Sequence, residues 1–201
     1  MELSPLAREK LAKIGELTEE EKAKLKYAGQ LNALLADYFT HKLSTDDLWK
    51  ELKKHKEEGQ AGILKEAQLK LLDTLNLTVS DADFDNRRKA MLAVETLKDG
   101  NDYLRLEQDL KSLENLRRQY REEIEKTYKI LKSRVEQQVK QATQQLSRQA
   151  AAQGAAIDIE GSVEASTKAT PEWKSFMAKH ESTYNQKFKD YLDKLLKKLQ
   201  S

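Results

Sequence analysis

The three histidines are the residues of this 201-residue chain with the most versatile chemistry. His41, His55 and His180 lie far apart, and none has a second histidine three or four positions away, as paired metal ligands on one helix require. We interpret His180, in "KHES", as a histidine buried in a seam between helices. The sequence therefore predicts no metal site.

A run of carboxylates is the next candidate for chemistry. Asp81, Asp83 and Asp85 alternate in "SDADFDN", but the glycine and distal glutamate of a calcium-binding loop are missing. Acidic residues are also favourable in the first turn of a helix, which is our interpretation of this run. The chain has no cysteine and no glycine-rich phosphate loop. We predict a non-enzymatic protein without catalytic residues or cofactors.

Two arginine clusters could follow a phosphate backbone, Arg87 with Arg88 and Arg117 with Arg121. A run of glutamates follows the second cluster at once, and such interleaved signs favour a solvated helix surface. Lysine and arginine number 36 against 34 acidic residues, which gives a net charge of +2 and no strong field to attract nucleic acid. A nucleic-acid-associated coiled-coil protein is thus the alternative prediction, and the balance of charge disfavours it.

The composition predicts an all-α protein. Charged residues make up 35 % of the chain and aromatic residues 6 %, which is too polar for one thick core and typical of long helices. The absence of cysteine fits a reducing compartment, and no segment approaches 18 consecutive apolar residues. We predict a cytoplasmic protein that does not enter a membrane.

The first 79 residues predict a small helical bundle. Cap residues and apolar stripes place helices at about 4–15, 18–40, 44–52 and 63–75. The third helix begins with Ser44 and Asp47 at the spacing of a capping box, and Leu48, Trp49 and Leu52 follow on one side.

Residues 80–201 predict a second domain with two long helices, at about 103–149 and 171–199. Their apolar residues recur every eleven positions, at Leu113, Ile124, Val135 and Leu146 in the first helix and at Trp173, Tyr184 and Leu195 in the second. An eleven-residue period corresponds to about 3.67 residues per turn, so the apolar seam runs nearly straight. Two helices with one period most simply pack as an antiparallel coiled-coil hairpin.

The tip of this hairpin, residues 150–170, breaks the helical pattern. In "AAIDIEGSVEAS" apolar and polar residues alternate, and Gly161 with Ser162 lies where a tight turn would. The tip is therefore either a short β-hairpin or a flexible linker rich in alanine, glycine and serine. A lone two-stranded hairpin is marginal in water, so an ordered tip would need another surface to lean on.

Two long helices with an intervening hairpin resemble, in outline, prefoldin, a chaperone whose coiled-coil arms hold unfolded clients. The likeness covers Tyr103 to Leu199, and the additional N-terminal bundle departs from it. The outline is also similar to the coiled-coil nucleotide-exchange cofactors of heat-shock chaperones. Both resemblances imply protein binding without catalysis.

The leading prediction is a protein-interaction module, either an assembly scaffold or a chaperone-like coiled-coil protein. Its partner would be a second copy, in a homodimer or larger oligomer, or a client protein, bound through apolar stripes and the tip. The residues predicted to make this interface are Leu131, Val135, Val139, Leu146, Ile157, Ile159, Val163, Trp173, Met177 and Tyr184.

Overall fold

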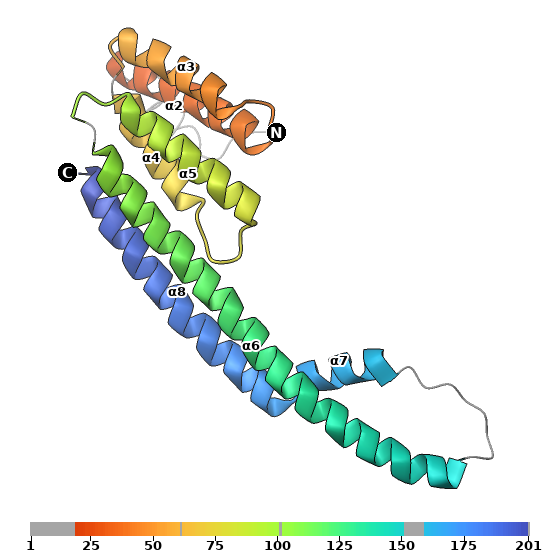
Figure 1. Ribbon diagram of the computed structural model, residues 1–201. Coiled ribbons are helices and arrows are strands. Elements are labelled where there is room, and N and C mark those ends of the chain that lie inside the picture. The colour runs from red at the N-terminus through yellow and green to blue at the C-terminus, as the bar shows by residue number, and fades with distance from the viewer. Residues whose placement is uncertain (1–18, 61, 101, 151–158, 201) are drawn as a thin grey trace, which may run out of the picture. The chain divides into compact units, whose positions relative to one another are not determined.

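The described part of the chain is helical throughout. The structure, a computed structural model, describes residues 19–60, 62–100, 102–150 and 159–200. Its helices are α2 (Glu19–Phe39), α3 (Thr45–Glu57), α4 (Gly62–Asp73), α5 (Asp81–Thr96), α6 (Tyr103–Ala150), α7 (Ile159–Ala169) and α8 (Pro171–Gln200) (Figure 1). No strand occurs among the described residues, which confirms the all-α prediction.

The residues that the sequence predicts as helix N-caps do precede helices in the structure. Ser44 Oγ accepts the backbone N–H of Asp47 at 3.1 Å, and the carboxylate of Asp47 accepts the N–H of Ser44 at 3.2 Å, so the predicted capping box opens α3. Ser80 caps α5 in a similar way, which confirms that the acidic run is a helix start. Thr170 Oγ1 accepts the N–H of Trp173 at the start of α8. The helix predicted at 4–15 lies outside the described residues.

Contacts divide the chain into two units. The first unit holds the described residues within Met1–Leu75, Val79–Glu107 and Leu196–Ser201, and the second holds Asn76–Thr78 and Gln108–Leu195. The change of composition in the sequence predicts a domain boundary at residue 79. In the structure α5 contacts both α3 and α4, and its face of Phe84, Met91 and Val94 is buried, so α5 belongs to the first unit.

Within the second unit, α8 packs antiparallel to α6. The ring of Tyr120 stacks on that of His180 at 5.1 Å, and two turns further along α6 the ring of Tyr128 meets Trp173 edge-on at 5.4 Å. Contacts on α8 thus move toward its N-terminus as those on α6 move toward its C-terminus. The buried residues of α6 include Leu113 and Val135, which belong to the eleven-residue pattern, together with Tyr120 and Leu131.

The β-hairpin predicted at the tip is wrong over residues 159–169, because these residues form α7. The same letters that alternate also recur every fourth position, and Val163 and Thr167 are buried on one face of α7. Glu164 and Lys168 form an i,i+4 ion pair of 2.6 Å on the exposed side. Residues 151–158, including Ile157, lie outside the described residues.

Candidate functional site

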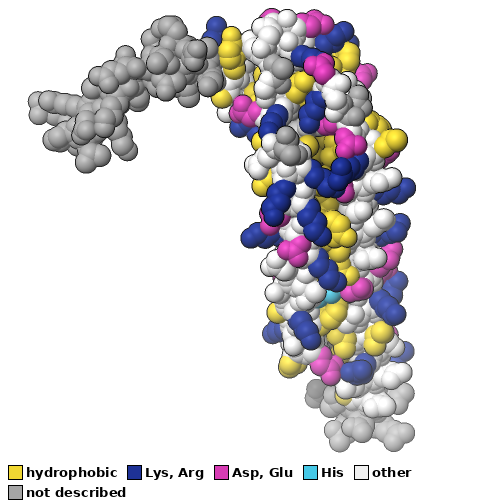
Figure 2. Space-filling view, turned by 90° about the vertical axis from the view of Figure 1, so that its left-hand side faces the viewer, with side chains coloured by type: hydrophobic (Ala, Val, Ile, Leu, Met, Phe, Trp, Pro, Cys, Tyr) yellow, Lys and Arg dark blue, Asp and Glu magenta, His cyan; other side chains and the backbone are white. Residues whose placement is uncertain are grey.

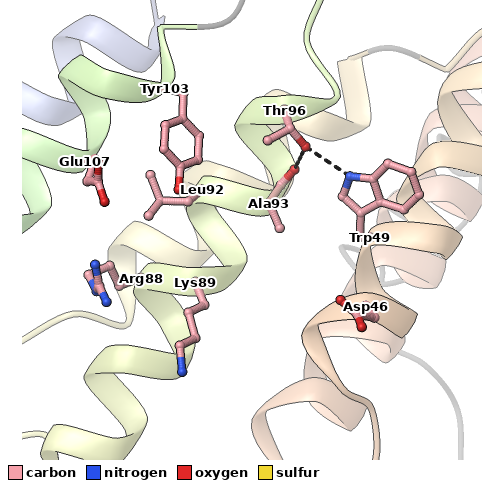
Figure 3. Close-up of a pocket in the computed structure, with 9 residues that line it drawn as sticks. All are labelled: Asp46, Trp49, Arg88, Lys89, Leu92, Ala93, Thr96, Tyr103 and Glu107. Carbon is pink, nitrogen blue, oxygen red and sulfur yellow. Dashed lines mark hydrogen bonds between the residues drawn. The ribbon is translucent and has the colours of Figure 1, made fainter.

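One cavity of the described residues is a groove in the first unit, which we call the α5 groove. It has a volume of about 470 Å³, within the range of small-molecule and peptide sites. Three helices line it (Figure 3): α3 gives Asp46 and Trp49, the start of α6 gives Tyr103 and Glu107, and α5 gives the floor between them. The floor residues are Arg88, Lys89, Leu92, Ala93 and Thr96.

Trp49 is held in place at one wall of the α5 groove. Its indole Nε1–H donates to Thr96 Oγ1 at 3.0 Å, and that hydroxyl donates to the carbonyl of Ala93 at 2.7 Å (Figure 3). The ammonium of Lys53 lies 5.3 Å from the centre of the indole ring. The half-buried indole therefore loses little conformational freedom when a ligand arrives.

The two cations of the floor are already paired with one carboxylate. Arg88 reaches Asp85 Oδ1 at 2.8 Å, and Lys89 reaches Asp85 Oδ2 at 2.7 Å. The hydrogen bonds from Lys89 and then Arg88 lower the pKa of Asp85 below its usual value. The carboxylates of Asp46 and Glu107, on opposite walls, have no ion pair with any part of the chain that the structure describes.

A buried polar cluster fixes the turn between α5 and α6, which directly precedes Tyr103 of the groove. Glu95 is 4 % exposed and accepts hydrogen bonds from Gln68 Nε2 at 2.7 Å and from the backbone N–H of Asp102 at 2.9 Å. Burial raises the pKa of Glu95, but these hydrogen bonds, together with Lys98, outweigh it and leave the pKa below its usual value. The turn between α5 and α6 is thereby tied to the core.

A second polar cluster lies in the second unit around His180, beside a smaller cavity of about 240 Å³. His180 Nε2 lies 3.1 Å from the carbonyl oxygen of Tyr120, and a carbonyl can only accept, so Nε2 carries the proton. Its Nδ1 lies 3.5 Å from one carboxylate oxygen of Glu123, and the other oxygen of Glu123 accepts the hydroxyl of Tyr184 at 2.8 Å. With 7 % exposure, His180 is the seam histidine that the sequence predicted.

Tyr184 is the most strongly shifted group of this cluster. Burial, followed by the hydrogen bond to Glu123 and the charge of that carboxylate, raises the pKa of Tyr184 to about 12. The rings of Phe176 and Tyr184 flank His180. The contacts of His180 with Tyr120 and of Tyr184 with Glu123 thus join α8 to α6.

Four of the ten residues predicted to form an exposed apolar interface are buried in the second unit. Leu131, Val135, Val163 and Tyr184 are buried, so they are not free stripes on the surface. Leu131 and Val135 lie on α6, against which α8 packs. Of the other predicted residues, Val139, Trp173 and Met177 are half-buried, Leu146 and Ile159 lie in α6 and α7, and Ile157 lies outside the described residues.

The arginines of the nucleic-acid alternative do not form one exposed surface. Arg117 is 1 % exposed and donates to the carbonyl of Leu77, and Arg87 donates to the carbonyl of Thr74. Arg88 is paired with Asp85, and Arg121 is exposed. Figure 2 shows lysine and arginine side chains interleaved with acidic ones on the face that it presents. Phosphate binding favours a surface of one sign, and the described residues on this face carry both signs.

The described residues contain no group of three or more histidine, aspartate and glutamate side chains placed to hold a metal ion. None of the described helices carries an 18-residue stretch apolar enough to cross a membrane.

The sequence did not single out the α5 groove. Trp49 was assigned to the apolar side of its helix, whereas Leu48 and Leu52 are buried and Trp49 lies beside them, half exposed. An aromatic residue next to an apolar stripe, rather than within it, is the sequence feature that could have indicated a partly exposed binding residue. Tyr103 and Leu92 reach the groove through tertiary packing and gave no local signal.

Comparison with known proteins completes this description. No curated protein and no solved structure matches the chain. A family model matches residues 49–201, which begin at Trp49 and include the groove residues of α5 and α6. The chain belongs to this family, DUF6657, a family of unknown function.

Proposed function

We propose that the chain is a non-enzymatic protein-interaction module that combines an N-terminal helical bundle with an antiparallel coiled-coil hairpin. The α5 groove receives a helical segment of another protein. The observation that carries this proposal is Trp49, an indole fixed by Thr96 and half exposed at the wall of a groove. Tryptophan, tyrosine and arginine dominate the energetics of protein interfaces, and Trp49, Tyr103 and Arg88 all line the groove.

The form of the α5 groove favours a helix as its occupant. One helix, α5, supplies the floor, and the small side chain of Ala93 lets a docked backbone approach closely. The walls are provided by α3 and the start of α6, as in grooves that bind the apolar face of an amphipathic helix. The hydroxyl of Thr96 is engaged by Trp49 and Ala93, so it is not an activated nucleophile.

Site-specific photo-crosslinking tests this proposal. A photoreactive amino acid replaces Lys89 in the groove, in the cells that make the protein, and a matched probe replaces the exposed Lys189 on α8. We expect the Lys89 probe to capture a defined protein that the Lys189 probe does not. Trp49→Ala should weaken binding of that protein by roughly 30-fold, because a buried interface anchor is worth about 2 kcal/mol or more.

Folding must be separated from binding in this test. Amide hydrogen exchange of α3 and α5 should be unchanged in Trp49→Ala apart from residues next to the indole. If Trp49→Ala stays folded and the captured protein still binds with its original affinity, the α5 groove is not the interface and the proposal fails.

A further inference from the structure

We propose that the α5 groove selects a cationic amphipathic helix, one with lysine or arginine on both flanks of its apolar face. This inference rests on the proposed function and specifies the partner chemistry of the same groove. Two observations carry it: the positions of the unpaired carboxylates and the internal pairing of the cations on the floor.

The two cations of the floor share one carboxylate partner. Arg88 and Lys89 contact the two carboxylate oxygens of Asp85, at 2.8 and 2.7 Å, so one net positive charge is left on the floor. An incoming acidic side chain would have to compete with Asp85 for either cation. The carboxylates of Asp46 and Glu107 on the walls outnumber that one remaining positive charge, so an acidic partner gains little.

The carboxylates of the groove are still available. Asp46 is exposed on the α3 wall and Glu107 is half-buried on the α6 wall, and neither has an ion pair within the described residues. A cation that approaches either wall gains an attraction without displacing an existing partner. Charge complementarity thus favours a basic partner over an acidic one.

The apolar part of the groove lies between these two carboxylates. Figure 3 shows Leu92 and Ala93 on the floor, between Trp49 on one side and Tyr103 on the other. A docked helix would place its apolar face over this floor, and its flanking lysines would extend their long stems along the walls toward Asp46 and Glu107.

Three labelled peptides test the inference with the full chain. Each is a helical amphipathic peptide of about five turns with leucine and alanine on one face and lysine, glutamine or glutamate on the other. Fluorescence anisotropy gives the affinity of each peptide for the wild type, for Trp49→Ala and for the double variant Asp46→Asn, Glu107→Gln. The control Glu181→Gln, Asp193→Asn removes two exposed carboxylates from α8, so it carries the same change in net charge.

The wild type should bind the lysine peptide about threefold to tenfold more tightly than the glutamine peptide, and should bind the glutamate peptide weakest. The lysine preference should shrink as salt rises, vanish in Asp46→Asn, Glu107→Gln, and persist in the control. Trp49→Ala should weaken the lysine and glutamine peptides alike. If the double variant keeps the full lysine preference, or the control loses it equally, the charge inference is wrong while the groove remains a binding site. If Trp49→Ala changes neither affinity, both the groove and the inference fail.

Discussion

At the scale of single residues, one glutamate in each unit contacts side chains or backbone groups of other segments and so stabilises the packing of that unit. Glu95 accepts hydrogen bonds from Gln68 and from the turn that begins α6. In the second unit, Glu123 of α6 is shared by His180 and Tyr184 of α8. In both cases a single carboxylate ties together segments far apart in the sequence, and the lowered pKa of Glu95 links the ionisation of that residue to folding.

Glu95 makes the stability of the first unit sensitive to acid. Because the pKa of Glu95 is lowered in the folded chain, its stabilisation is present above the unfolded value of about 4.3 and is lost as pH falls through the folded pKa. Glu95→Gln should cost about 1–3 kcal/mol near neutral pH. That difference should shrink as pH falls from about 5 to about 3, as amide exchange of α4 and α5 will measure. A difference that stays constant over this range would contradict the assignment.

Tyr184 makes the second unit sensitive to alkali. Its raised pKa favours the protonated phenol, so its stabilisation is present below the unfolded value of about 10 and is lost as pH rises toward about 12. Tyr184→Phe should cost about 1 kcal/mol near neutral pH, and thermal unfolding should show this cost shrinking above about pH 10. Tyr191→Phe is the control, because Tyr191 is an exposed residue of the same helix. Equal pH dependence in the two variants would refute this role.

Local chemistry could be predicted from the sequence, whereas the groove could not. Ser44 and Ser80 act on backbone groups three residues away, so their caps are encoded within a few letters. His180 was recognisable because it continues an apolar stripe. The groove depends on α3, α5 and α6 meeting in space, and nothing within a short window around Trp49 or Tyr103 encodes that meeting.

At the scale of elements, α7 shows how period can be misread in a short segment. Over eleven residues, Ile159, Val163 and Ala165 satisfy alternation, while Ile159, Val163 and Thr167 satisfy a helical spacing of four. An isolated helix of this length is marginal in water, so packing decides the outcome. Val163 and Thr167 are buried, so packing along this face favours the helix.

Val163 should therefore control whether α7 forms. Val163 is 2 % exposed, and Val163→Asp would bury an unpaired charge, at a cost of about 3 kcal/mol or more, unless α7 detaches from α6. Amide exchange in residues 159–169 should approach that of an unfolded chain, while α8 stays protected.

Ala165→Asp is the matched control, since it adds the same charge at an exposed position of α7. It should change exchange little, within about 0.5 kcal/mol. If both variants opened α7 to the same extent, charge rather than packing would be the cause.

At the scale of the whole molecule, the chain forms two units, and the helices α6 and α8 each contribute residues to both. The sequence predicted the length of α6 well, because its apolar pattern is long and regular. It could not tell whether those apolar residues face another molecule or the same chain. Leu131 and Val135 show the outcome, since both are buried within the second unit.

The double variant Leu131→Asp, Val135→Asp tests this assignment. It should abolish protection of α7 and of the facing part of α8, because each substitution costs several kcal/mol, while α3 to α5 stay protected. Ser133→Asp, Gln137→Asp adds the same charge at exposed positions of α6 and should leave exchange unchanged. A variant whose second unit stays folded while the molar mass in solution falls would restore these residues to an interface between subunits.

The two tryptophans give the protein a built-in pair of optical reporters. Trp49 is held by Thr96 in the first unit, and Trp173 contacts Tyr128 and Phe176 in the second. The chain contains no others, so removing one indole leaves the emission of a single unit. The unfolding of each unit can thus be followed separately by tryptophan fluorescence. A ligand in the α5 groove would shift the emission wavelength of Trp49 and leave that of Trp173 unchanged.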